Sequence, residues 1–238
     1  MNLKERLAAR ASLDAVVVRT PSYQVIEVLA AGGVECVVID TEHAPFDDAQ
    51  LDAMMAMARA LGVDALVRVP AAEPIGIQRA LDGGATGVVV PHVHAPVVAA
   101  DVVRWCHYGD RGRGYSGSTR SAGWGMRSLA EVVAQAATST VVVVQIEDVG
   151  AFDDLDAIAR TDGVDAVFVG AADLAVGLGA TSPNDTAVVA AGQRIIEAAT
   201  GAGRSVVAYA PHPAEAERCR AAGANVIVSG SDQSRLRP

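Results

Sequence analysis

The chain is nearly devoid of lysine. Lys4 is its only lysine, although lysine and arginine together number 19 among 238 residues. Arginine stays protonated in proteins and cannot form a Schiff base, and Lys4 lies far from any expected strand end. This excludes a Schiff-base lysine, and with it pyridoxal phosphate bound as an imine. Any activation of a carbonyl group must therefore come from a metal ion or from hydrogen bonds.

Other scarcities narrow the class of protein. Aromatic residues make up 4% of the chain and hydrophobic residues 51%, so Val, Ala, Leu and Ile must build the core. The three cysteines have no CxxC spacing, which gives no support for a disulfide framework or a zinc site. No apolar run approaches the ~20 residues of a membrane span, and the first residues lack the apolar segment of a signal peptide. We therefore expect a cytoplasmic protein.

The charge balance argues against two kinds of partner. A formal net charge of −9 disfavours binding to nucleic acid and to anionic membranes. We expect small molecules as partners instead.

Short runs rich in Val, Ile and Ala alternate with helical stretches along the whole chain, as in parallel sheets buried on both faces. The expected strands are Ala15–Arg19, Cys36–Asp40, Asp64–Arg68, Gly87–Pro91, Thr140–Ile146, Ala166–Val169, Ser205–Tyr209 and Asn225–Ser229. Eight such units predict a (β/α)₈ TIM barrel formed by a single domain over residues 1–238. An open doubly wound sheet would usually carry GxGxxG after its first strand, whereas Thr20-Pro21-Ser22 follows here.

One segment interrupts this alternation. Residues 107–127 contain six glycines and four arginines, and loops this long are uncommon without a function. The segment could cradle a carboxylate or a phosphate. It could equally be a flexible loop that contacts another subunit, and the sequence does not decide between the two.

Polar residues gather where the expected strands end. In chain order, the residues at the strand ends are Asp40, Glu42, His43, Arg68, Pro91, His92, Gln145, Glu147, Asp173, Tyr209 and Asp232. In a barrel, all of these would face the mouth at the carboxyl ends of the strands. Glu147 and Asp173 each follow a buried strand, and we interpret them as a pair of metal ligands. Two carboxylates completed by water suit Mg²⁺ or Mn²⁺, with Co²⁺ possible.

Five motifs in order resemble the HpcH/HpaI family of metal-dependent (class II) pyruvate aldolases. They are ID-x-EH-x-P at 39–45, R-x-P at 68–70, LD-x-GA-x-G-x-x-VP at 81–91, QIE at 145–147 and G-x-ADL at 170–174. The resemblance covers nearly the whole chain and implies a barrel of the phosphoenolpyruvate/pyruvate type. One departure is Ala171, where the family often has proline.

The resemblance also implies roles for individual residues. Glu147 and Asp173 would bind the divalent cation, and a 2-oxo acid would chelate it. Gln145, Asp173 and the backbone N–H of Ala172 would contact that substrate. His43 would be the general base, Asp82 would orient it, and Arg68 would stabilise developing negative charge.

Together these features predict a lyase that reversibly cleaves a 4-hydroxy-2-oxo acid to pyruvate, or hydroxypyruvate, and an aldehyde. The resemblance further implies a homo-oligomer, a trimer or hexamer. Two alternatives stay open: a lyase of CoA thioesters of the citrate lyase β or malyl-CoA type, and an inactive barrel used for binding. The sequence identifies neither the aldehyde nor the preferred metal ion.

Overall fold

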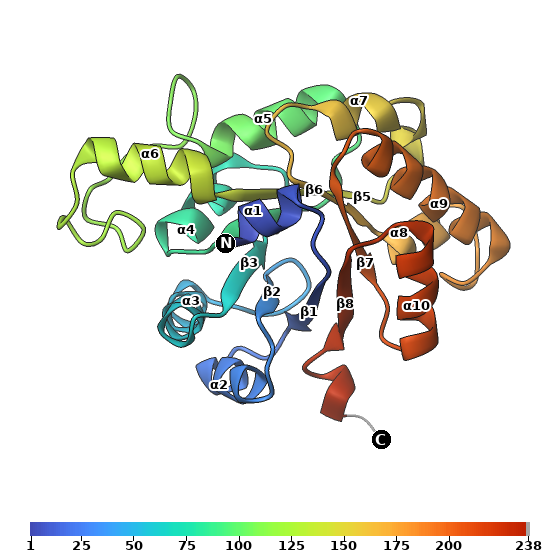
Figure 1. The fold of residues 1–238 in the computed structure, drawn as a ribbon, viewed down its shortest axis with the longest axis horizontal. Helices are drawn as coiled ribbons and strands as arrows, with labels where there is room; N and C mark the ends of the chain where they lie inside the picture. The colour runs from blue at the N-terminus through green and yellow to red at the C-terminus, as the bar shows by residue number, and fades with distance from the viewer. Residues whose placement is uncertain (237–238) are drawn as a thin grey trace.

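The computed structural model describes residues 1–236, and they form a closed barrel of eight parallel strands in the order β1 to β8 (Figure 1). The strands are β1 (Leu13–Val18), β2 (Cys36–Asp40), β3 (Asp64–Arg68), β4 (Gly87–Val90), β5 (Val141–Ile146), β6 (Ala166–Val169), β7 (Ser205–Tyr209) and β8 (Val226–Ser231). The predicted (β/α)₈ fold is thus confirmed, and every expected strand is present within two residues of its expected ends.

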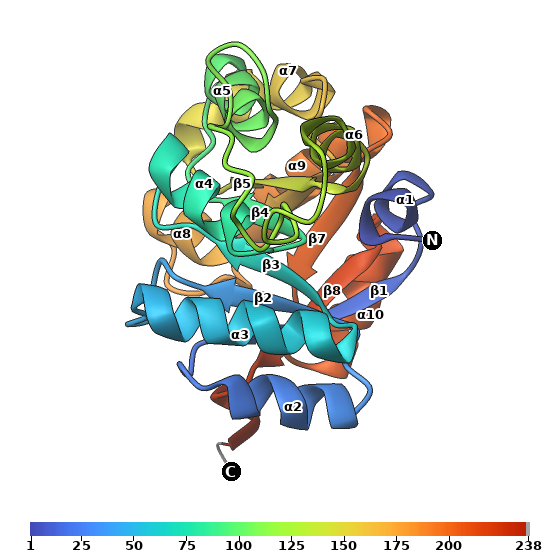
Figure 2. The ribbon, with the colours of Figure 1, turned by 90° about the vertical axis from the view of Figure 1, so that its left-hand side faces the viewer.

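Helices surround the barrel and connect its strands. They are α1 (Leu3–Ala8), α2 (Tyr23–Ala31), α3 (Asp48–Leu61), α4 (Pro74–Asp82), α5 (Pro96–Cys106), α6 (Leu129–Ser139), α7 (Leu155–Arg160), α8 (Ala171–Gly177), α9 (Thr186–Gly201) and α10 (Pro213–Ala222), with short 3₁₀ turns η1 (Val149–Asp153) and η2 (Ser234–Leu236). Figure 2 shows α2 and α3 packed side by side outside β2 and β3. None of the helices within residues 1–236 has the length and apolar character needed to cross a bilayer.

Helix α3 illustrates how local sequence sets these elements. Asp47 accepts a hydrogen bond from the backbone N–H of Gln50, and the Gln50 side chain accepts one in return. This reciprocal pair satisfies two backbone donors that a helix start leaves free. Gly62 ends the helix at φ +70°, a conformation that glycine adopts without strain. Between these ends, Met54 and Met55 are buried in the core.

The barrel strands separate two apolar layers with a period of two. Val16, Val37 and Val67 belong to the layer under the helices, whereas Val17 and Val38 belong to the layer inside the barrel. Because side chains alternate across a strand, continuing the inner row past the last apolar residue predicts which polar side chains face the mouth. On β1, β2, β3 and β5 this row continues into Arg19, Asp40, Arg68 and Gln145.

Helix α1 closes the opposite, amino-terminal end of the barrel, which we call the base. Leu3 and Leu7 join the inner apolar cluster. The Lys4 ammonium lies 2.7 Å from the Asp165 carboxylate and donates a 2.9 Å hydrogen bond to the carbonyl of Thr140. The only lysine of the chain is therefore a structural cation, remote from the mouth.

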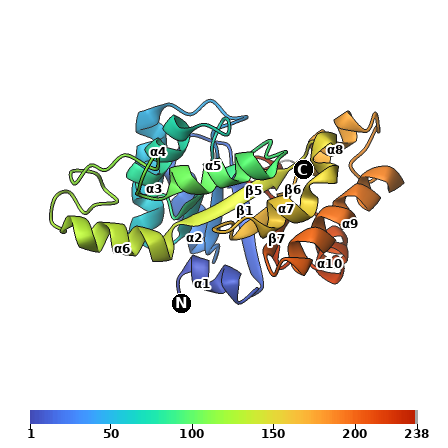
Figure 3. The same cartoon turned by 90° about the horizontal axis from the view of Figure 1, so that it is seen from above.

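The glycine- and arginine-rich segment 107–127 also lies on the base side, since it leads from the end of α5 toward β5. With α6 it projects outward from the barrel (Figures 1 and 3). Arg113 is bonded to Asp82 and to Ser121, and Arg120 binds both oxygens of Asp52. Two of its four arginines are thus already paired with carboxylates of α3 and α4. This segment does not line the mouth of its own barrel.

Candidate functional site

A buried carboxylate organises one half of the mouth. Asp40 is completely buried at the end of β2 and receives two arginines. Arg68 donates from Nε to Oδ1 at 2.9 Å and from Nη2 to Oδ2 at 2.7 Å, and Arg19 donates from Nε to Oδ2 at 2.8 Å. Asp40 thus holds two positive charges side by side, and Glu42 Oε2 lies 3.3 Å from the remaining Nη1 of Arg68.

These contacts change the proton affinity of both partners. Burial alone would raise the pKa of Asp40, but the hydrogen bonds and charge of Arg68 lower it below its usual value. Burial alone would likewise lower the pKa of Arg68, and Asp40 raises it instead. Both groups therefore stay ionised, and Arg68 is a fixed cation in the mouth.

Glu147 dominates the other half. It is 2% exposed, and burial raises its pKa to about 6. The Gln145 amide donates to Oε2, and the backbone N–H of His92 donates to Oε1 at 3.0 Å. A Cβ at Gly170 would overlap the Glu147 side chain. The glycine at 170 is therefore required by the close approach of β6 to this carboxylate.

Three potential metal ligands converge here. One ligand atom each from Glu42, His92 and Glu147 lies within 4.8 Å of the others. His92 adopts φ +55°, an uncommon conformation for a residue with a side chain, and this places its backbone N–H against Glu147. Its Nδ1 lies 3.2 Å from Asp148 Oδ2, and the neighbouring carboxylates raise its pKa although burial acts in the other direction.

The donor chemistry of this group fits a divalent cation. Two carboxylates and an imidazole accommodate Mg²⁺, Mn²⁺ or Co²⁺ in proteins. Glu42 Oε2 and Gln145 Oε1 are buried and accept no hydrogen bond from residues 1–236. Buried acceptors without partners are costly in a finished core, so these two atoms point to a ligand that completes the site.

Asp173 lies beside this group rather than within it. It occupies the first turn of α8 and is exposed, as is Ala172. The charge of Asp173 contributes to raising the pKa of Glu147, although burial is the larger cause. The structure thus brings the two expected ligands into one electrostatic neighbourhood. Glu42 and His92, for which the sequence suggested only strand-end positions, form the group of possible metal ligands with Glu147.

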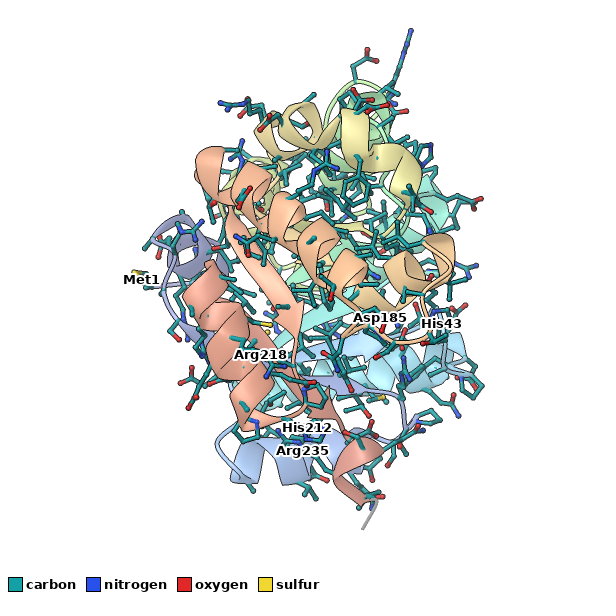
Figure 4. The ribbon with its side chains drawn as sticks, turned by 90° about the vertical axis from the view of Figure 1, so that its right-hand side faces the viewer. Met1, His43, Asp185, His212, Arg218 and Arg235 are labelled. Carbon is teal, nitrogen blue, oxygen red and sulfur yellow. The ribbon has the colours of Figure 1, made fainter. Side chains whose placement is uncertain are left out.

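His43 lies on the loop after β2 (Figure 4). Its backbone N–H donates to Asp40 Oδ1 at 3.2 Å, and its Nε2 lies 3.8 Å from Glu42 Oε2. The imidazole is 54% exposed and thus accessible to a substrate in the mouth.

Asp82 is not brought to His43 in this chain. It is the last residue of α4, which ends at the base just before β4, and it is bonded to Arg113. The two residues therefore lie at opposite ends of the barrel, and no contact between them occurs in residues 1–236. The LD-x-GA motif gave no information on which end of the barrel its aspartate would occupy.

Comparisons with known proteins found related aldolases. The family model of HpcH/HpaI aldolase/citrate lyase matches residues 16–238. The chain is 36% identical over 238 residues to the hydroxypyruvate/pyruvate aldolase of Paraburkholderia phytofirmans, covering 97% of this chain and 91% of that one. It is 36% identical over 211 residues to the 5-keto-4-deoxy-D-glucarate aldolase of Shigella dysenteriae, covering 87% and 80% of the two chains.

A solved structure gives the same result for the fold. The crystal structure of an HpcH/HpaI aldolase/citrate lyase family protein from Burkholderia cenocepacia superposes with a TM-score of 0.93 at 34% identity. The superposition covers 98% of this chain and 94% of that one.

Proposed function

The chain belongs to the HpcH/HpaI aldolase/citrate lyase family and is a carbon–carbon lyase, and from this premise we propose its reaction. It reversibly cleaves a 4-hydroxy-2-oxo acid to pyruvate, or hydroxypyruvate, and an aldehyde, and it needs a divalent metal ion. The relatives named hydroxypyruvate/pyruvate aldolase and 5-keto-4-deoxy-D-glucarate aldolase support this substrate class.

The observation that carries the proposal is the division of the mouth. An acidic half, where Glu42 and Glu147 approach His92 within 4.8 Å, adjoins the fixed cation Arg68, whose Nη1 lies 3.3 Å from Glu42. A 2-oxo acid has a chelating end that suits the acidic half. Its keto oxygen, which gains negative charge during cleavage, would lie between that half and Arg68.

Glu147 and Asp173 would hold the metal ion, with Glu42 and His92 as the neighbouring candidates. A bound divalent cation would supply Lewis-acid stabilisation of negative charge on the keto oxygen. Gln145 positions Glu147 through its amide, and its free Oε1 is available to the substrate. The backbone N–H of Ala172, in the first turn of α8, would receive the substrate carboxylate.

His43 moves the proton. In cleavage its imidazole takes the proton of the 4-hydroxyl group as the bond between C3 and C4 breaks, and a proton later returns to C3. Arg68 offers a fixed positive charge beside the developing anion. With no lysine at the mouth, this set of residues performs the reaction without an imine.

Asp82 can assist His43 only from a second copy of the chain, because the two residues lie at opposite ends of one barrel. We retain this role for Asp82 within the proposed homo-oligomer, a trimer or hexamer. Within one chain, the carboxylate that accompanies His43 is Glu42, 3.8 Å away.

Exchange of the pyruvate methyl protons in deuterated buffer, followed by NMR with Mg²⁺, tests the proposal. Exchange needs the base and the metal ion but no aldehyde. The wild-type protein should exchange these protons, and His43→Ala should lose nearly all of this activity. His212→Ala, which changes an exposed histidine at the start of α10, is the matched control and should stay within about twofold of wild type, the range expected of a surface change. Wild-type protein that exchanges no protons with Mg²⁺, Mn²⁺ or Co²⁺ would refute the proposed function.

A further inference from the structure

Arg19 is a second cation in the mouth, and its backbone is held firmly. It follows β1, and its backbone N–H and that of Thr20 donate to the two oxygens of Asp232 at 2.9 and 3.0 Å. Asp232 is itself buried and donates its N–H to the carbonyl of Val17. The Asp232 carboxylate thus fixes the backbone at the end of β1. The Arg19 side chain therefore starts from a fixed position on the inner row of the barrel.

The two arginines bound to Asp40 differ in how many guanidinium nitrogens are left without a hydrogen bond. Arg68 has Nε and Nη2 on Asp40, its Nη1 lies 3.3 Å from Glu42, and its side chain is 12% exposed. Arg19 uses only Nε, and its side chain is 39% exposed. Within residues 1–236, neither Nη of Arg19 donates a hydrogen bond. Arg19 therefore presents the free edge of a guanidinium group to the mouth.

The position of Arg19 relative to the reacting centre follows from strand order. In a closed barrel of eight strands, β1 and β5 are diametrically opposed. Arg19 extends β1 and Glu147 follows β5, so the backbone positions of these two residues lie on opposite sides of the mouth, and Arg19 leans toward β2 through its bond to Asp40. A substrate whose 2-oxo acid end lies at Glu147 has its other end directed toward Arg19.

Resting on the proposed function, we propose that Arg19 binds a carboxylate at the far end of the substrate. It thereby selects acceptor aldehydes that carry an anionic group. A guanidinium edge pairs with a carboxylate through two parallel hydrogen bonds. The shared Asp40 holds the guanidinium in place before the substrate arrives, which reduces the entropy lost on binding.

Two aldehydes of equal chain length isolate the charge. Succinic semialdehyde carries a carboxylate where butanal carries a methyl group. With pyruvate and Mn²⁺, Arg19→Gln should lower kcat/KM for succinic semialdehyde about tenfold or more, as expected for one charge-assisted contact. Most of this loss should appear in KM for that aldehyde. The loss for butanal should be several times smaller.

Two further variants separate charge from structure. Arg19→Lys keeps the cation but not the planar edge, and should retain part of the preference for the charged aldehyde. Arg218→Gln removes an arginine whose side chain is 65% exposed on α10 and should leave the ratio between the aldehydes unchanged. Melting temperatures of all variants check that the fold keeps its stability.

Equal losses for both aldehydes in Arg19→Gln would overturn the inference. They would mean that Arg19 acts through Asp40 or binds the carboxylate of pyruvate. No loss for either aldehyde would overturn it as well. Failure of the proposed function would be seen separately, because the wild-type protein would then cleave no aldol and exchange no pyruvate protons.

Discussion

The two ends of the barrel use the same charged residue types in opposite ways. At the base, Lys4 is paired with Asp165 and Arg113 with Asp82, both in contacts supplied by the chain itself. At the mouth, Glu42 Oε2 and Gln145 Oε1 accept no hydrogen bond from residues 1–236. Polar groups paired within the chain stabilise the fold, whereas acceptors left without a hydrogen bond are available to ligands.

The base has incomplete atoms too, which limits the contrast. The hydroxyl of Tyr108 and Nη1 of Arg120 are buried without a partner in residues 1–236. However, Arg120 already holds Asp52 through its other nitrogen, so its charge is matched. The difference between the ends concerns the buried Glu147 carboxylate, whose hydrogen bonds come only from neutral groups, the Gln145 amide and the backbone N–H of His92.

Removal of the metal ion should have the largest effect, and only at the mouth. EDTA should reduce aldol cleavage to background, and Mg²⁺, Mn²⁺ or Co²⁺ should restore it. Glu147→Gln should have the same effect on activity. Because the buried carboxylate is replaced by a neutral group of equal size, the melting temperature of the metal-free protein should not fall. Asp156→Asn, at an exposed residue of α7, is the control. Full activity in stripped protein would remove the proposed metal site.

Loss of Arg68 should come next. Arg68→Met should lower kcat by ~10²-fold or more, as for removal of one donor to a developing oxyanion. Arg68→Lys should recover part of the rate, because it restores the charge but not the fork on Asp40. Titration calorimetry with Mn²⁺ should show a much smaller change in metal affinity. An unchanged kcat would mean that Arg68 has a structural role, like the arginines in the ion pairs of the base.

The next largest effect concerns Asp82, which could stabilise the base of its own chain and also assist His43 at the mouth of another copy. Asp82→Asn removes the charge opposite the buried Arg113. We expect the free energy of unfolding to fall by about 2 kcal/mol, less than for a fully buried pair because the Asp82 side chain is 21% exposed. Urea denaturation measures this change. Asp52→Asn, at the 54% exposed partner of Arg120, should have a smaller effect.

The catalytic role of Asp82 needs a separate measurement. If Asp82 of one copy orients His43 of another, mixed oligomers of Asp82→Asn and His43→Ala should exchange pyruvate protons faster than the average of the two variants alone. Activity equal to that average would leave Asp82 a purely structural residue.

The smallest expected effect concerns Asp64, at the base. Burial raises its pKa, partly offset by the hydrogen bond from Thr86. A carboxyl group with a raised pKa in the folded state favours folding at low pH, and this contribution is lost as the pH rises through that pKa. Asp64→Asn should therefore raise the melting temperature slightly at pH 7 and have less effect near pH 3. A lower melting temperature at pH 7 would contradict the assigned shift.

The barrel was predictable because its information is local. Buried parallel strands are continuous apolar runs in the sequence. Each run ends where the next side chain facing the inside of the barrel is polar, as at Asp40 and Arg68. The metal neighbourhood was half predictable. Glu147 follows from its strand, but the approach of Glu42 and His92 depends on loop conformation, including the positive φ of His92. No spacing rule in the sequence encodes that conformation.

Two expectations left the end of the barrel open, for one reason. Asp82 ends α4 and the segment 107–127 follows α5, and in this fold helices end at the base. A motif reports that residues occur together in a family, but not the end of the barrel at which each residue lies. Tracing the direction of the chain through α4 and α5 would have assigned both to the base.

The single lysine has a practical consequence. Lysine amines form imines with the carbonyl group of aldehydes. Here the one lysine is at the base, 21% exposed and held 2.7 Å from Asp165, while the mouth carries arginines that do not form imines. The catalyst should tolerate high aldehyde concentrations. For the same reason, it should react poorly with supports and cross-linkers that depend on lysine amines.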